Sequence, residues 1–137
     1  MPSTLAAHVA SLLDREIPVA LGFECPLFVP LEKNELRLTC ARENEGSRPW
    51  SAGAGCGALA TGIVQVTWVL NQIRLLAQRQ HQAFLDWQAF AQSGCGLFLW
   101  EAFVSNLGKA SGHVADARAG AAAFIDALPD PRTASAI

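Results

Sequence analysis

Two short, uncharged apolar runs constrain the fold of this chain more than any other feature. They span residues 19–23 and 95–100, and a glutamate follows each of them, Glu24 and Glu101. Strands that are covered by helices on both faces have this composition. Because helical patterns separate the two runs, we expect an α/β fold in which a small parallel sheet is flanked by helices.

The rest of the chain predicts helices and one long loop. A first helix, capped by Ser3 or Thr4, runs to about residue 15, and further helices are expected over 57–77, 80–92 and 113–128. Residues 30–54 are rich in proline, glycine and charge, which predicts a long loop with a brief strand at 36–40. Residues 129–137 are expected to form a frayed tail, and the 137 residues suit one domain.

Composition excludes some classes of protein. Hydrophobic residues make up 51% and charged residues 16%, against about 25% charged in ordinary soluble domains. This apolar composition argues against a disordered chain. The net charge of -2 argues against a high-affinity nucleic-acid binder. None of the four cysteines forms a C-x-x-C pair, and the N-terminus lacks a basic segment followed by an apolar run. We therefore expect four reduced, mostly buried cysteines in a cytoplasmic protein.

One segment has the length of a membrane span. Residues 49–73 carry no charge, residues 52–70 are mostly apolar, and Gly53 and Gly57 form a small-xxx-small pair. Polar side chains interrupt it, which favours a helix buried in a globular core and no membrane. The tryptophans that occur in apolar patterns are expected in the core as well: Trp68, Trp87 and Trp100.

Three acidic residues form the candidate catalytic and metal-binding set. Glu24 and Glu101 follow the two expected strands, whose carboxyl ends meet at one edge if the strands are parallel. Asp116 lies in the first turn of the last helix, beside His113. Converging carboxylates suit Mg²⁺ or Mn²⁺, and two such ions can clamp a phosphodiester.

Structural roles are the alternative for the same acids. Glu24 and Glu101 can pair with arginines, of which Arg42, Arg48 and Arg74 are the candidates. Asp116 is also favoured near a helix N-terminus by the helix dipole, with His113 as a cap or a solvated side chain. Cys25 follows Glu24, but no histidine is beside it in sequence, which favours an inert buried thiol over a nucleophile.

A glycine-rich segment, RPWSAGAGCG, precedes the long helical pattern. Its backbone amides at Gly53 and Gly55, together with Arg48, are a candidate anion-binding site. The segment has no Gly-Lys-Ser/Thr sequence and therefore is not a Walker loop. Close helix packing through small residues is the alternative explanation.

Four segments carry a resemblance to a known family: VALGFECPLFVPL, RPWSAGAGCGALATG, LFLWEAFVS and GHVADARAGAAAF. They are similar to an uncharacterised family of predicted nucleases with a ribonuclease-H-like fold, over most of residues 21–124. By this resemblance, Glu24, Glu101 and Asp116 fall on the acidic positions of the family. It implies a phosphodiesterase or nuclease dependent on Mg²⁺ or Mn²⁺, or a degenerate relative, with a nucleotide or nucleic-acid substrate.

The resemblance is partial at the N-terminus. Ribonuclease-H-like domains open with a three-stranded meander, and its first strand supplies the first catalytic aspartate. This chain begins with a helical pattern, so we expect a ribonuclease-H-like remnant that lacks the first three strands. Because such a small sheet has exposed edges, we expect a homo-oligomer in which a second copy covers it. A non-catalytic homodimeric scaffold or interaction protein is the alternative function.

Overall fold

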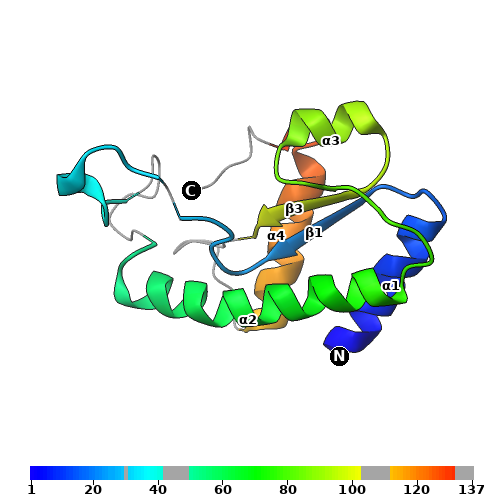
Figure 1. The fold of residues 1–137 in the computed structure, drawn as a ribbon, viewed down its shortest axis with the longest axis horizontal. Helices are drawn as coiled ribbons and strands as arrows, with labels where there is room; N and C mark the ends of the chain where they lie inside the picture. The colour runs from blue at the N-terminus through cyan, green and yellow to red at the C-terminus, as the bar shows by residue number, and fades with distance from the viewer. Residues whose placement is uncertain (30, 42–49, 103–111, 132–137) are drawn as a thin grey trace.

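The computed structural model describes residues 1–29, 31–41, 50–102 and 112–131. Its elements alternate between helices and strands, and the long helices and the two apolar strands follow each other in the predicted order (Figure 1). In chain order they are α1 (Pro2–Asp14), β1 (Val19–Phe23), the 3-10 helix η1 (Glu35–Arg37), α2 (Gly53–Leu76), β2 (Ala83–Phe84), α3 (Trp87–Ser93), β3 (Leu97–Glu101) and α4 (His113–Asp126). The expected α/β class, with a small parallel sheet between helices, is confirmed.

The described strands form one sheet in the order β1-β3-β2, and both neighbouring pairs are parallel. In the pairing of β1 with β3, Val19 lies opposite Leu97 and Phe23 lies opposite Glu101. The two apolar runs of the sequence therefore pair directly. β3 is buried at Leu97, Phe98 and Leu99, as expected for a strand covered on both faces, whereas in β1 only Leu21 is buried and Ala20 is exposed.

The third strand, β2, corrects the helix that was expected over residues 80–92. Ala83 and Phe84 pair with the start of β3, so the chain is extended there. The helix begins only at Trp87, because the Asp86 side chain accepts a hydrogen bond of 2.7 Å from the backbone N–H of Ala89. Gly94 ends the helix in a left-handed conformation, φ 68°, as the expected break at residues 93–94 requires.

Helices cover the two faces of the sheet with different kinds of core. On one face, β1 and β3 pack against α1 and α2 through an aliphatic cluster made of Ala6, Val9, Ala10, Leu13, Leu21, Val69, Ile73, Leu97 and Leu99. On the other face, α3 and α4 enclose an aromatic cluster made of Phe84, Trp87, Phe90, Phe98, Trp100 and Phe124. Alternate residues of β3 supply the two clusters, as the period of two in a strand requires. Figure 1 shows α2 and α4 on opposite sides of the strands.

Three smaller expectations are wrong. The brief strand at 36–40 is instead η1 and a turn, and the Asn34 side chain caps η1 by accepting from the N–H of Leu36. Ser3 and Thr4 lie inside α1, whose N-cap is Met1. All four cysteines are free as expected, but only one of them, Cys25, is buried.

The expectation of a buried long helix is also wrong. Among the residues of α2, only Gly62, Val69 and Ile73 are buried, and Trp68 is 44% exposed. The length and apolar composition of α2 would allow it to cross a membrane, and 11% of its most apolar stretch is buried. Most of the apolar surface of α2 therefore faces away from the core that the described residues form.

Candidate metal centre

The register of the sheet decides where Glu24, which follows β1, and Glu101, the last residue of β3, lie. Phe23 and Glu101 are opposite each other in the parallel pair, so their side chains leave the sheet on the same face. Phe23 packs against the aliphatic cluster, which identifies this as the face covered by α1 and α2. Glu24 comes one residue later, and its side chain contacts the first turn of α4 on the opposite face.

Glu101 supports the turn that follows β1. Its Oε1 atom accepts a hydrogen bond of 2.6 Å from the backbone N–H of Leu27. Burial raises the pKa of the neighbouring Cys25 thiol, and the negative charge of Glu101 raises it further. Glu101, expected as a metal ligand and catalytic residue, is thus placed at the turn and is not part of the ligand cluster described next.

Glu24 and Asp116 do come together, and His113 joins them. One ligand atom from each of these three side chains lies within 4.8 Å of the other two. His113 Nδ1 is 3.5 Å from Glu24 Oε2. Asp116 is buried, with 3% of its surface exposed, whereas the Glu24 and His113 side chains are 39% and 93% exposed. The cluster therefore has a fixed inner ligand and two outer ligands that solvent can reach.

The packing of α4 on the sheet brings its first turn to the end of β1. Trp100 on β3 stacks on Phe124 of α4, with ring centroids 4.7 Å apart. Gly22 makes room for this indole, because a Cβ atom there would lie 2.7 Å from the ring of Trp100. Gly120 of α4 lies beside Ala102 and Trp100, where an added Cβ atom would be in ordinary contact at 3.7 and 3.9 Å. α4 therefore lies close against β1 and β3, and its N-terminal turn reaches Glu24.

His113 and Asp116 project from the same side of α4 because residues three apart are neighbours on a helix. His113 stands three residues before Asp116 in the sequence, and the only roles expected for it were those of a helix cap or a solvated side chain. The His-x-x-Asp spacing at a helix start was the signal for a ligand pair, and Glu24 completes it only through the tertiary fold.

Two carboxylates and an imidazole favour a divalent cation at this position. The positive end of the α4 dipole, about half an elementary charge, opposes a cation there. Two ionised carboxylates carry roughly four times that charge, so their attraction prevails. Carboxylates suit Mn²⁺ as well as Mg²⁺, and imidazole binds transition-metal ions such as Mn²⁺ and Zn²⁺ more readily than Mg²⁺, so this donor set would suit Mn²⁺ or Zn²⁺ better than Mg²⁺.

The candidate anion site at the start of α2 is described only in part. Gly53 is the first residue of α2, with open space around its Cα atom, and Gly55 lies in the first turn. The N-cap residue, Ala52, provides no side-chain hydrogen bond. Arg48 and Arg42 lie outside the described residues, and Arg74 donates to the side chain of Asn71.

Comparison of the chain with protein-family models, with curated proteins and with solved structures found no match. The resemblance to predicted nucleases therefore stays a prediction.

Proposed function

We propose that Glu24, His113 and Asp116 bind one divalent cation, and that the bound cation serves hydrolysis of a phosphodiester in a nucleotide or nucleic acid. The observation that carries this proposal is the convergence of three ligand atoms within 4.8 Å, from the end of β1 and the first turn of α4. Carboxyl ends of parallel strands are the usual position of sites in open α/β sheets.

The exposure of the cluster suits hydrolysis. A bound divalent cation supplies a water of lowered pKa and polarises a phosphoryl oxygen. Because Glu24 and His113 are exposed, water and substrate can reach the cluster from their side, while buried Asp116 holds its inner end. The second carboxylate oxygen of Glu24 could also accept a proton from the attacking water, whereas the one acceptor nitrogen of His113 would be taken by the cation. The three residues supply ligands for one cation, which favours a one-metal mechanism over a two-metal clamp.

Metal binding is tested by thermal unfolding of the full chain with MnCl₂, MgCl₂ or KCl of equal ionic strength. A Mn²⁺ concentration about tenfold above Kd stabilises the folded protein by about 1.4 kcal/mol, which raises Tm by about 4–7 °C. We expect a larger shift with Mn²⁺ than with Mg²⁺. The shift should disappear in E24Q and in H113Q, whose changed side chains are exposed and leave the core intact.

D126N is the matched control for this experiment. Asp126 is the last residue of α4, so the substitution removes one carboxylate from the same helix at the end far from the cluster. It should keep the full Mn²⁺ shift. An equal shift in wild type, E24Q and H113Q would show that the cation binds elsewhere and would overturn the proposed site.

Hydrolysis is tested with bis(4-nitrophenyl) phosphate and with an end-labelled single-stranded oligonucleotide, in Mn²⁺ and in EDTA. Wild type and D126N should hydrolyse at least one of them in Mn²⁺ only, and E24Q should lose this activity. Activity that persists in E24Q or in EDTA would contradict the assignment.

A non-catalytic homodimeric scaffold is the second candidate function. The observation that favours it is the apolar surface of α2 that the described residues leave exposed. Mn²⁺ binding without hydrolysis of either substrate would support this candidate over the enzyme.

A further inference from the structure

The exposed side of α2 carries an ordered pattern of side-chain size. Seven exposed residues recur every three or four positions and so form one stripe along the helix, opposite the buried residues Gly62, Val69 and Ile73. We call this stripe the outer seam; its residues are Gly53, Gly57, Ala60, Val64, Trp68, Asn71 and Leu75. None of them is charged.

Residue size changes along the outer seam from small to large. In the first half, Cβ atoms built on Gly53 and Gly57 meet nothing within 4 Å, and Ala60 is exposed. In the second half, Trp68 is 44% exposed and Leu75 is 60% exposed. Val64, 70% exposed, stands at the midpoint. One half of the seam thus offers hollows, and the other half offers side chains that could fill them.

We propose that a second copy of this chain docks on the outer seam, with the two α2 helices antiparallel about a two-fold axis at Val64. This register places Trp68 opposite Ala60 and Leu75 opposite Gly53 of the other copy, so each large side chain meets a small residue. Both Val64 side chains meet on the axis. A two-fold interface is self-complementary in this way, because the same surface is used by both copies.

A parallel pairing fits the same residues poorly. It would set Trp68 against Trp68 and glycine against glycine, which leaves crowding at one end and a gap at the other. It would also bring the two Arg74 side chains together. In the antiparallel register these arginines lie about 30 Å apart along the helix axis, and the helix dipoles oppose each other.

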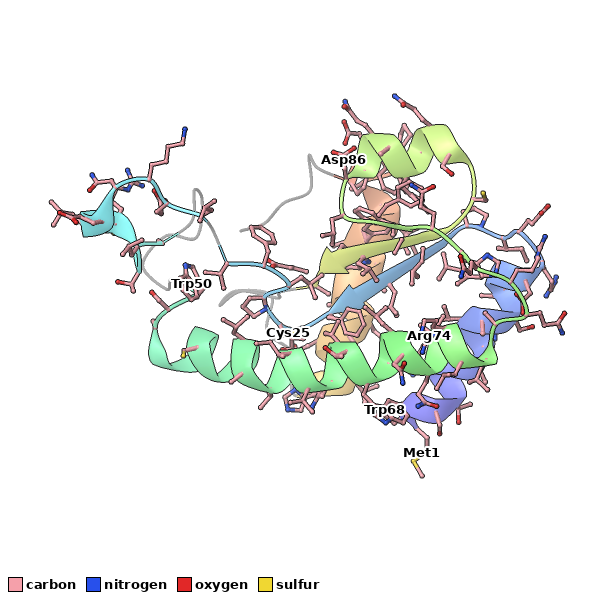
Figure 2. The ribbon with its side chains drawn as sticks, viewed as in Figure 1. Met1, Cys25, Trp50, Trp68, Arg74 and Asp86 are labelled. Atoms are coloured by element: carbon pink, nitrogen blue, oxygen red, sulfur yellow. The ribbon has the colours of Figure 1, made fainter. Side chains whose placement is uncertain are left out.

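A second copy is a better occupant of the seam than lipid. The opposite side of α2 holds Val69 and Ile73 in the aliphatic cluster shared with α1 and the sheet. If α2 crossed a bilayer, the bilayer would also have to contain α1 and the sheet, including the polar end of α1 at Asp14 and Arg15. The seam lies on the side of α2 away from the strands, where Figure 2 shows Trp68.

The size of the seam indicates a reversible dimer. α2 has 24 residues and is therefore about 36 Å long, and with a width of about 11 Å its footprint is on the order of 400 Å² per copy. Stable interfaces bury about 800 Å² per partner. Helix pairing alone therefore gives a weak association that depends on protein concentration.

The test is sedimentation velocity of the full chain from low to high micromolar concentration, with and without EDTA. Wild type should shift from the 14.6 kDa chain mass towards twice that mass as concentration rises. V64E places two carboxylates against each other on the axis, and we expect the dimer Kd to rise about tenfold or more. I63E is the matched control, because Ile63 is the adjacent residue, is 60% exposed and lies beside the seam.

A charge exchange makes the test specific for the two-fold arrangement. V64E and V64K should each associate about tenfold or more weakly than wild type, and an equimolar mixture of the two should recover association, because residue 64 of one copy meets residue 64 of the other. Circular dichroism checks that each variant is folded, which is expected because Val64 is exposed.

Three results would overturn the proposal: a wild type that is monomeric throughout, equal effects of V64E and I63E, or a wild type that is monomeric in buffer and floats with liposomes. Since no seam residue is a proposed metal ligand, loss of Mn²⁺ binding and loss of the dimer are separate outcomes.

Discussion

Gly62 lies where α2 crosses the turn after β1, and its missing side chain lets the helix approach that turn. A Cβ atom at this position would be 2.5 Å from Cys25 Sγ and 2.7 Å from Cys25 Cβ, closer than such atoms pack. Figure 2 shows Cys25 between the end of β1 and α2. The small residue therefore sets the distance between the helix and the segment that carries Glu24.

Gly62→Ala should destabilise the fold relative to Gly57→Ala. Both substitutions gain about 1 kcal/mol of helix propensity, but only the methyl group at residue 62 overpacks against Cys25, which costs about 1–3 kcal/mol. Urea unfolding at low protein concentration, where self-association is absent, measures the difference. Equal free energies of unfolding for the two variants would show that the turn after β1 moves to accommodate the methyl group without loss of stability.

Contacts between element ends join α1 to the segment that follows α2. The Asp14 carboxylate accepts from the backbone N–H of Gln78, at 3.1 and 3.0 Å, and lies 2.9 Å from His81 Nε2. Arg79 donates to the carbonyl of Asp14 and pairs with Glu16 at 3.1 Å. These bonds fix the end of α1 beside the exit from α2, where the chain then enters β2.

This junction predicts an acid-sensitive step in stability. Hydrogen bonding with His81, and then with the N–H of Gln78, lowers the pKa of Asp14 below its ordinary value of 3.8. A lowered folded-state pKa means that the stabilisation is complete above the unfolded-state value and is lost as pH falls through the folded-state value. D14N should therefore lower Tm near neutral pH and flatten its fall at acidic pH.

Tm measured from neutral pH to about pH 2 on wild type, D14N and D126N checks this prediction. D126N should follow the wild-type curve, because Asp126 is not part of the junction. If the D14N curve ran parallel to the wild-type curve over the whole range, the carboxylate of Asp14 would not be the source of the acid sensitivity.

The whole molecule has three layers, and Cys25 lies between the sheet and α2. It is 6% exposed, and burial followed by the charge of Glu101 raises the pKa of its thiol. Cys40, Cys56 and Cys95 are exposed. The reactivity of the four thiols therefore reports on whether the layers are closed.

N-ethylmaleimide should add to three cysteines of the native chain and to the fourth only after unfolding. The thiolate is the reactive form, and both burial and the raised pKa keep Cys25 protonated and out of reach. Mass spectrometry counts the adducts in buffer and in denaturant. C25S should give three adducts under both conditions, and rapid addition of a fourth adduct to native wild type would contradict the layered packing.

Local sequence patterns predicted the class of fold and much of its content. The uncharged run at 19–23 matches β1, the run at 95–100 contains most of β3, and α4 begins at His113 as expected. These elements are predictable because apolar periodicity and helix breakers act over a few neighbouring residues. β2 was missed because its two residues are too few to show a period and are extended only through pairing with β3.

The composition of the candidate site depended on contacts that are remote in sequence. Glu24 and Glu101 look equivalent as residues that follow apolar runs. The pairing of Phe23 with Glu101 separates them, because a step of one residue moves a side chain to the other face of a sheet. The same long-range packing brings His113 and Asp116 to Glu24 and leaves the outer seam of α2 exposed. The sequence alone determines residue chemistry and local periodicity. Strand register, and which side of a helix is buried, are decided only when distant segments pack together.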